Sequence, residues 1–394
     1  MPRAFLVVMD SVGIGGAPDA GLYFNAGAPD TGANTVGHIA QAVGGLCLPA
    51  LDRLGLGAAV RLASGMEAPG LGSAPEGLWG AATEASPGKD TPTGHWELAG
   101  LILPFAWHQF PQKVPAFSEE LLQAVCAAAG TTGTFGNCHA SGTEITAQLG
   151  AAHVQTGWPI CYTSVDSVFQ VAAHEVHFGL DKLLTLCRQI APRLHEMKVG
   201  RVIARPFVGD AETGFRRTGN RRDFACAPPG KTLCDWAKAD GREVRAIGKI
   251  GDIFSMRGIA RVDKGSDGEL MTHLSHAIDE APDGSLTFAN FVEFDALYGH
   301  RRDAAGYAAA LKRFDAGIAG VEANLKDGDL LLLTADHGND PTWVGTDHTR
   351  ERVPVLAAGV GGGEIGHVAF VDVAASVAAH LGLSQRGPGR SFLA

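Results

Sequence analysis

Short apolar runs alternate along the chain with longer stretches in which apolar residues recur every three or four positions. Runs that are apolar at nearly every position predict strands covered on both faces, and they occur at Ala4–Met9, Val202–Phe207, Val244–Ile247, Leu286–Glu293, Leu330–Thr334 and Val353–Ala357. Helical spacing over residues 303–325 predicts an amphipathic helix, and residues 371–383 predict a closing helix. The alternation predicts an α/β fold with a central, mostly parallel sheet flanked by helices.

The middle of the chain has a different character. It opens with aromatic, His, Pro and Gly residues, continues with a helix-rich stretch and ends in a cluster of arginines. At roughly 150 residues per domain, a chain of 394 residues suggests two or three domains. We therefore expect one core built from residues 1–102 and 228–394, interrupted by an inserted α+β domain over residues 103–227.

The composition excludes several classes of protein. A net charge of −10 argues against a nucleic-acid or anionic-membrane partner, but it says little about small anionic substrates. The N-terminal apolar run is too short for a secretory signal, and no run of about 18 apolar residues occurs. The seven cysteines are scattered without a C-x-x-C pair, which argues against a disulfide framework. We expect a cytoplasmic protein that acts on a small molecule, without a membrane or an obligatory protein partner.

Four short segments concentrate Asp, His and Thr side chains. In the first, Asp10 follows a predicted strand, where open α/β sheets place their sites, but an Asp there can also be a turn or a helix cap. The second, K-D-T-P-T-G-H-W-E at residues 89–97, equally fits a loop in which Asp90 caps a helix. The third places Asp295 and His300 just past a strand, which also fits a surface loop with an incidental His.

The fourth segment carries the strongest signal. The apolar run Leu330–Thr334 leads into Asp336 and His337, and a second pair, Asp347 and His348, follows eleven residues later. Carboxylates and imidazoles without thiolates suit two divalent ions such as Mn²⁺ or Zn²⁺. Two such ions about 4 Å apart can clamp the attacking and leaving oxygens of a phosphoryl displacement. The pattern therefore indicates a two-metal phosphoryl-transfer enzyme.

The order and spacing of seven of these residues resemble the alkaline phosphatase superfamily: Asp10, Thr91, Asp295, His300, Asp336, His337 and His348. Within it, the strings D-S-V-G-I-G, K-D-T-P-T-G-H-W-E and T-A-D-H-G-N-D-P-T are similar to the phosphopentomutase family. The central strings G-N-C-H-A-S-G-T-E-I and G-R-V-I-A-R-P-F agree, so the resemblance covers essentially the whole chain. It implies an alkaline-phosphatase-like core with an inserted cap domain.

The resemblance also implies roles for these residues. Thr91 would carry the phosphoryl group, because alignment on Gly94 and His95 places Thr91, not Thr93, at the nucleophile position. One metal ion would be held by Asp10, Asp336, His337 and the Thr91 oxygen, and the other by Asp295, His300 and His348. Mn²⁺ is the expected ion, and a sugar bisphosphate, ribose 1,5-bisphosphate or glucose 1,6-bisphosphate, is the expected activator.

The inserted domain would recognise the sugar phosphate. Its candidate residues, with Lys249 from near the domain junction, are Ser164, Asp166, Val168, Arg201, Ile203, Arg217 and Lys249. Arginine suits phosphate because its planar fork binds two oxygens at once, although a solvated basic face is the simpler interpretation of the arginine cluster. The chain departs from the family pattern at Val165, Arg222 and Gly251, which leaves the pentose preference open.

The implied activity is an isomerisation. Such an enzyme interconverts α-D-ribose 1-phosphate, or its 2-deoxy analogue, and the 5-phosphate through a phosphothreonine and a bisphosphate intermediate. Three alternatives use the same residues: a sugar phosphatase with the same metal core, a cofactor-independent phosphoglycerate mutase, and a metal-holding phosphosugar sensor without turnover. The central strings disfavour the second, and an intact Thr91 beside a full ligand set argues against the third.

Overall fold

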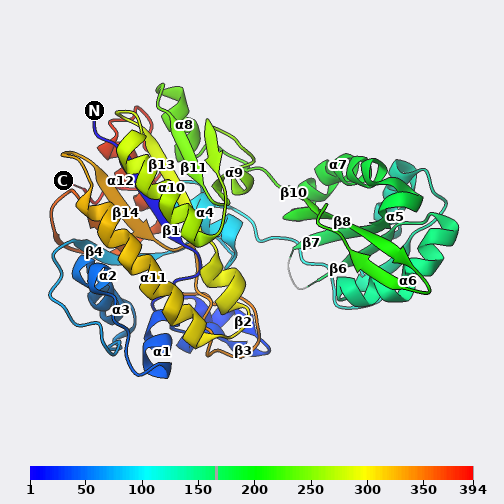
Figure 1. Cartoon of the computed structure of the whole chain (residues 1–394), viewed down its shortest axis with the longest axis horizontal. Coiled ribbons are helices and arrows are strands. Elements are labelled where there is room, and N and C mark those ends of the chain that lie inside the picture. The colour runs from blue at the N-terminus through cyan, green and yellow to red at the C-terminus, as the bar shows by residue number, and fades with distance from the viewer. Residues whose placement is uncertain (165–166, 394) are drawn as a thin grey trace. The chain divides into compact units, whose positions relative to one another are not determined.

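The computed structural model describes residues 1–164 and 167–393, and the chain divides into two compact units. The larger unit comprises Met1–Phe105 and Pro228–Ala394, and the smaller unit comprises Ala106–Ala227 (Figure 1). The first boundary lies between residues 105 and 106, whereas the sequence pattern predicted it between residues 102 and 103. The second boundary lies between residues 227 and 228.

The described part of the larger unit forms an eight-stranded sheet. Its strands, in spatial order, are β12 (Arg261–Asp263), β11 (Val244–Ile247), β13 (Leu286–Phe291), β1 (Ala4–Met9), β14 (Leu330–Thr334), β15 (Val353–Ala358), β4 (Leu78–Thr83) and β16 (Gly363–Ala369). The strands from β12 to β14 run parallel, β15 is antiparallel to both of its neighbours, and β4 and β16 are parallel. A mostly parallel central sheet is therefore confirmed.

Three parallel strands at the centre of this sheet place their carboxyl ends side by side. Every residue of β1, β13 and β14 is buried, as their apolar sequences require of strands covered on both faces. In the ladders, Met9 pairs with Phe291 and Val8 pairs with Thr334. The residues that follow the three strands therefore emerge at one edge of the sheet, where open α/β sheets place their ligands.

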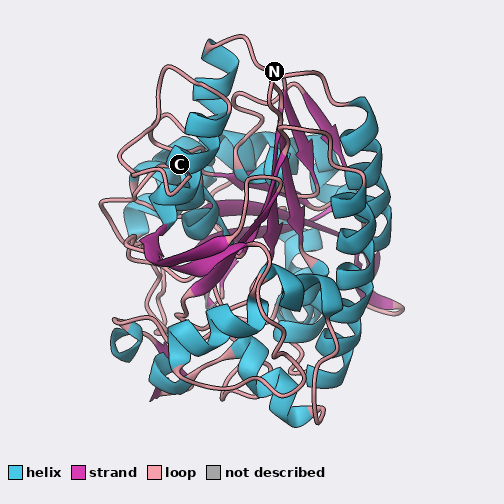
Figure 2. Cartoon of the chain, turned by 90° about the vertical axis from the view of Figure 1, so that its left-hand side faces the viewer, coloured by secondary structure: helices cyan, strands magenta, loops and turns pink. Residues whose placement is uncertain are grey.

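Helices cover both sides of this sheet (Figure 2). They are α1 (Thr35–Ala42), α2 (Pro49–Leu54), α3 (Leu56–Ser64), α4 (Thr91–Leu98), α8 (Leu233–Ala239), α9 (Ile250–Ile253), α10 (Asp267–Glu280), α11 (Ala304–Ala323) and α12 (Phe370–His380). The 3-10 turns Ala20–Leu22 and Asp30–Gly32, the short strands β2 (Phe24–Asn25) and β3 (Ala28–Pro29), and the π-helix η4 (Phe294–Gly299) complete the larger unit. The predicted periodicity is confirmed in α11, which buries Tyr307, Leu311, Phe314, Ile318 and Val321.

The smaller unit is built on its own six-stranded sheet. Its strands are β5 (Phe135–His139), β6 (Ile160–Thr163), β7 (Val168–His174), β8 (Arg201–Asp210), β9 (Gly214–Arg217) and β10 (Arg222–Ala225), in the order β10-β8-β7-β6-β5 with β9 paired to β8. Its helices are α5 (Glu119–Ala129), α6 (Gly142–Thr156), the π-helix η3 (Glu175–Gly179) and α7 (Leu180–Glu196). Two hydrophobic clusters fill it, one containing residues of α5 and α7 and the other containing Ile145 of α6.

Sequence patterns located some strands and missed others. The bounds expected for β1, β11 and β14 match the structure, whereas β8 is longer than expected and β4 and β16 were not expected. Strand β16 has no buried residue and sets glycines, Glu364 and His367 among its apolar residues, so it lacks an apolar run. Strands β6 and β7 are fully buried, but they were not expected either. Among the described residues, no helix combines the length and the hydropathy needed to cross a membrane.

Candidate metal centre

Carboxylates and imidazoles converge at the edge of the large sheet where β1, β13 and β14 end. Asp10 follows β1, Asp295 lies in the π-helix after β13, and Asp336 and His337 follow β14. These four side chains are almost fully buried. Two groups each bring their ligand atoms within 4.8 Å of one another, Asp10 with Asp336 and His337, and Asp295 with His337 and His348. His337 belongs to both groups.

The distances place all six of the expected Asp and His ligands in one cluster. His337 Nε2 lies 3.7 Å from Asp10 Oδ1 and 3.3 Å from Asp336 Oδ2. His348 Nε2 lies 3.4 Å from Asp295 Oδ1, and its ring stacks on that of His337 with centroids 4.0 Å apart. His300 is the most exposed member, but its Nε2 lies 3.1 Å from Asp295 Oδ2 and 3.2 Å from His348 Nε2.

The cluster fits divalent cations on its own chemistry. No described residue donates a hydrogen bond to the buried Oδ1 of Asp10. Burial and the nearby charges of Asp336 and Asp295 raise the pKa of Asp10 well above its ordinary value. Buried carboxylates this close repel one another unless a cation neutralises them. Oxygen and imidazole donors without thiolate suit hard or borderline divalent ions, so the residues present fit a metal pair.

His337 and Asp295 are in the states that ligation requires. Burial lowers the pKa of His337 to about 4, despite the opposing charge of Asp336, so its ring is neutral near pH 7 and offers a lone pair. Burial opposes ionisation of Asp295, but the imidazoles of His348 and His300 hold its pKa well below the ordinary value. A neutral imidazole and an ionised carboxylate are the forms that bind metal.

Thr91 is the first residue of α4, and its hydroxyl faces this cluster. Thr91 Oγ1 lies 3.3 Å from His337 Nε2. Asp90 caps the helix, because its side chain accepts a hydrogen bond from Thr93 N at 3.1 Å. The hydroxyl of Thr93 donates to Asp90 Oδ2 at 2.8 Å. Of the two threonines, Thr91 therefore presents its hydroxyl to the ligands, while that of Thr93 serves the cap.

Three residues next to the cluster were not among the site residues expected from the sequence. Asn290 Nδ2 donates to Asp10 Oδ2 at 2.9 Å, and Asn339 Nδ2 donates to Asp295 Oδ1 at 2.7 Å. His95 Nδ1 lies 2.9 Å from the carbonyl oxygen of Thr91. Asn339 adjoins the strongest motif, and Asn290 is a polar residue inside an apolar strand. Both positions could therefore have been recognised from the sequence as candidate site residues.

The candidate substrate residues of the smaller unit share one face of its sheet. Val168 pairs with Arg201 in the parallel ladder of β7 and β8, and Gln170 pairs with Ile203, so these four side chains point to the same side. Ser164 joins them, because Gln170 Nε2 donates to Ser164 Oγ at 3.3 Å. Asp166 lies outside the described residues.

Basic groups gather on the α6 side of this sheet. Arg205 Nε donates to Gln170 Oε1 at 2.9 Å. Burial and the charges of Arg221 and Arg217 lower the pKa of Arg205, although the Tyr162 hydroxyl acts in the opposite direction. Arg221 also forms an ion pair with Asp223 at 2.7 Å, which offsets part of this positive charge. Arg205 and Gln170 were not among the residues expected from the sequence. Each lies two positions after an expected residue of the same strand, Ile203 and Val168 respectively, and this two-residue spacing is the signal that could have found them.

Lys249 lies in the larger unit as the residue before α9. It is exposed, and its charge lowers the pKa of Asp10 against the dominant effect of burial. Its ammonium group is therefore within electrostatic reach of the metal cluster.

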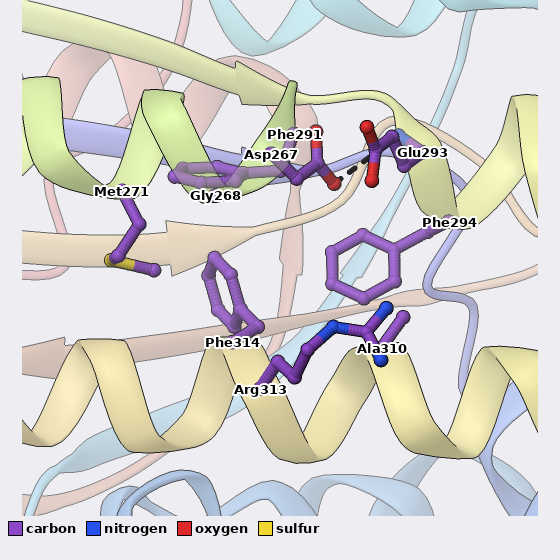
Figure 3. Close-up of a pocket in the computed structure, with 9 residues that line it drawn as sticks. All are labelled: Asp267, Gly268, Met271, Phe291, Glu293, Phe294, Ala310, Arg313 and Phe314. Atoms are coloured by element: carbon purple, nitrogen blue, oxygen red, sulfur yellow. Dashed lines mark hydrogen bonds between the residues drawn. The ribbon is translucent and has the colours of Figure 1, made fainter. Parts of the chain in front are cut away.

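A separate cavity of about 90 Å³ lies between α10, β13, η4 and α11 (Figure 3). Phe291, Phe294 and Phe314 form much of its wall, with Met271, Asp267, Glu293 and Arg313 at its margins. Burial and the nearby charge of Glu293 raise the pKa of Asp267 to about 7. Its lining contains none of the proposed metal ligands.

Comparison with known proteins agrees with this geometry. The sequence matches the metalloenzyme superfamily over residues 2–385. It is 55% identical to the phosphopentomutase of Rhizobium leguminosarum bv. trifolii and 53% identical to that of Agrobacterium fabrum, over the full length of both chains in each case. The phosphopentomutase of Methylobacterium radiotolerans is 52% identical over the same span.

Similarity to a solved structure concerns the fold alone. A protein of Pyrococcus horikoshii superimposes with a TM-score of 0.50 over 98% of both chains at 13% sequence identity. With the sheet order of the larger unit, this similarity confirms the α/β fold with a mostly parallel central sheet that the sequence predicted. The full-length similarity to curated relatives and the superfamily match show that the chain belongs to the phosphopentomutase family, a family of metal-dependent isomerases.

Proposed function

We propose that this enzyme interconverts α-D-ribose 1-phosphate, or its 2-deoxy analogue, and the corresponding 5-phosphate. The observation that carries the proposal is the position of the Thr91 hydroxyl, 3.3 Å from His337 Nε2 at the buried ligand cluster. A sensor or a simple metal store needs no nucleophile there. The names of the curated relatives support the same activity.

Thr91 is proposed to carry the phosphoryl group. Phospho-Thr91 transfers it to the free hydroxyl of the substrate, so that the bond from phosphorus to Thr91 Oγ1 breaks and a bond to the sugar oxygen forms, while the proton of that hydroxyl replaces the phosphoryl group on Thr91 Oγ1. The resulting sugar bisphosphate turns around, or leaves and rebinds, and returns its other phosphate to Thr91. This order explains how one reaction centre serves both ends of one sugar.

Two ligand groups drawn from this cluster, with His337 assigned to the first alone, are proposed to hold one divalent ion each. Asp10, Asp336, His337 and the Thr91 oxygen form one group, and Asp295, His300 and His348 form the other. Bound there, the ions supply Lewis-acid stabilisation of the charge that develops on the transferring oxygens. We propose Mn²⁺ as the activating ion; Zn²⁺ can bind more tightly without supporting more activity.

The phosphate that is not being transferred is proposed to bind the basic residues. Arg201 and Arg217, with Lys249 of the larger unit, are the proposed contacts, and Ser164, Asp166, Val168 and Ile203 are proposed to contact the sugar phosphate beside them. Replacing any of the three basic residues with Ala should lower kcat/KM by about ten- to a hundredfold, the cost of one charge-assisted hydrogen bond. Arg216→Ala is the control, because Arg216 is the exposed neighbour of Arg217 in β9.

Phosphorus NMR distinguishes the proposed activity from its alternatives. Ribose 5-phosphate is incubated with enzyme, Mn²⁺ and a catalytic amount of glucose 1,6-bisphosphate. Appearance of ribose 1-phosphate supports the mutase. Release of inorganic phosphate alone identifies a phosphatase, and an unchanged spectrum favours a phosphosugar sensor.

Intact-mass analysis tests the role of Thr91. Incubation with glucose 1,6-bisphosphate should add one phosphoryl group to the wild-type chain and to Thr93→Ala, but none to Thr91→Ala. Unphosphorylated enzyme should show a lag that either sugar bisphosphate shortens. Substantial mutase activity in Thr91→Ala would exclude this route and favour direct transfer between bound sugars.

A further inference from the structure

Two buried asparagines each donate a hydrogen bond to one ligand carboxylate. Asn290 lies within β13 and Asn339 follows the Asp336–His337 pair, and both are fully buried. Asn290 serves the group that contains Asp10, and Asn339 serves the group that contains Asp295. The two ligand groups therefore have one amide each.

Asn290 uses its amide to hold two parts of the first group. Its Nδ2 donates to Asp10 Oδ2 at 2.9 Å and lies 3.2 Å from His95 Nε2. Because an amide nitrogen carries two hydrogens, it can serve both acceptors. Asp10 Oδ1 is then the oxygen left facing His337 Nε2, 3.7 Å away.

The contact to His95 extends this arrangement to the nucleophile. If His95 Nε2 accepts from Asn290, its proton lies on Nδ1, which is 2.9 Å from the carbonyl oxygen of Thr91. The same Nδ1 lies 3.0 Å from Asp336 Oδ2. One amide thus connects Asp10, through His95, with the first turn of α4 and with Asp336.

Asn339 performs the equivalent task in the second group. Its Nδ2 donates to Asp295 Oδ1 at 2.7 Å, and its Oδ1 accepts a hydrogen bond from Arg302 Nη1, which fixes the orientation of the amide. Arg302 also donates to the carbonyl oxygens of Gly345 at 2.7 Å and Asp347 at 3.0 Å. Those carbonyls belong to the segment that carries His348, so Asn339 and Arg302 connect the two halves of this group.

We propose that Asn290 and Asn339 are positioning residues, each for one metal ion, which select the carboxylate oxygen that faces the ion. The inference rests on the ligand groups of the proposed function. Hydrogen-bond partners of metal ligands orient them, and their loss typically weakens metal binding about 10- to 100-fold. Because the two amides serve different groups, each should affect one ion and leave the other unchanged.

Binding of Mn²⁺ alone to full-length variants that retain one group tests this. In a His348→Ala background, which retains the Asp10 group, Asn290→Leu should weaken the remaining ion about 10- to 100-fold, measured by titration calorimetry. Asn339→Leu in the same background should leave its affinity within about threefold. In an Asp10→Ala background, which retains the Asp295 group, the two effects should be exchanged. Equal effects of both asparagines in both backgrounds would overturn the inference.

A serine series separates hydrogen bonding from packing. Leu keeps the branched shape of Asn without a donor, whereas Ser keeps a donor but leaves a small cavity. If the asparagines orient ligands, Ser should bind Mn²⁺ more tightly than Leu; if they only fill space, Leu should bind more tightly, and the inference fails. Two ions in either single-group background would instead refute the ligand groups themselves. Far-UV circular dichroism of each metal-free variant confirms that a folded protein is titrated.

Discussion

Replacing Glu351 with Gln tests whether burial near the metal ligands raises the pKa of the Glu351 carboxyl group. Glu351 is 2% exposed, and its side chain lies so close to Gly13 and Gly338 that a β-carbon at either position would collide with it. Its Oε2 accepts from Thr35 N at 2.9 Å and from Gly15 N at 3.1 Å. The carboxyl group thus joins segments that follow Asp10 and His337.

The magnitude follows from its pKa. Burial, and then the charge of Asp340, raise the pKa of Glu351 from 4.5 to about 7. A carboxyl group with a raised pKa stabilises the fold fully below the unfolded pKa, and this contribution is lost as pH rises through the folded pKa. Between pH 5 and pH 8 the wild-type protein should therefore lose about 2.5 kcal/mol of unfolding free energy through this one group.

Urea unfolding of metal-free protein at pH 5 and pH 8 measures this loss. Glu351→Gln cannot ionise, so its stability relative to wild type should rise by about 2.5 kcal/mol across that interval. The amide can still accept from the two backbone N–H groups, which limits the cost at pH 5. Glu67→Gln, at an exposed glutamate, is the control and should track wild type at both pH values. Parallel pH profiles of Glu351→Gln and wild type would refute the reasoning.

Three further outcomes are expected. Arg3→Met should cost about 3–5 kcal/mol in urea unfolding, because it leaves the carboxylate of Asp329 buried without its bidentate partner, and a loss below 1 kcal/mol would contradict this. Gly94→Ala should destabilise the protein by about 1–3 kcal/mol in thermal unfolding and weaken Mn²⁺ binding, because a β-carbon there would collide with the carbonyl oxygen of Asp336; unchanged Mn²⁺ affinity would contradict the close approach of α4. Asp267→Asn should stabilise the protein at pH 8 relative to pH 5, because the pKa of Asp267, raised to about 7, makes its ionisation unfavourable in the fold above that pH; equal effects at both pH values would contradict it.

Local sequence determined several of the strands of the large sheet. An apolar run such as Leu330–Thr334 can be satisfied only between two covering layers, so β1 and β14 were predicted with the bounds that the structure has, as was β11, in which Arg245 is half-buried. Burial alone was not sufficient, because β6 and β7 are fully buried and were not predicted. The adjacent Asp336 and His337 carried their own signal, because neighbouring metal-binding side chains after a strand need no tertiary information to be noticed. The resemblance to a family then extended these positions to Asp10, Asp295 and Thr91.

Tertiary structure decided which polar groups face one another. Strand β1 lies between β13 and β14, although both follow it by more than 275 residues, and this order brings Asp10 beside Asp295 and Asp336. No spacing along the chain encodes that order, because hydrophobic patterns specify how a strand is covered and not which strands are its neighbours. Asn290 shows the consequence: in sequence it interrupts an apolar run, and only the pairing of β13 with β1 places its amide against the Asp10 carboxylate.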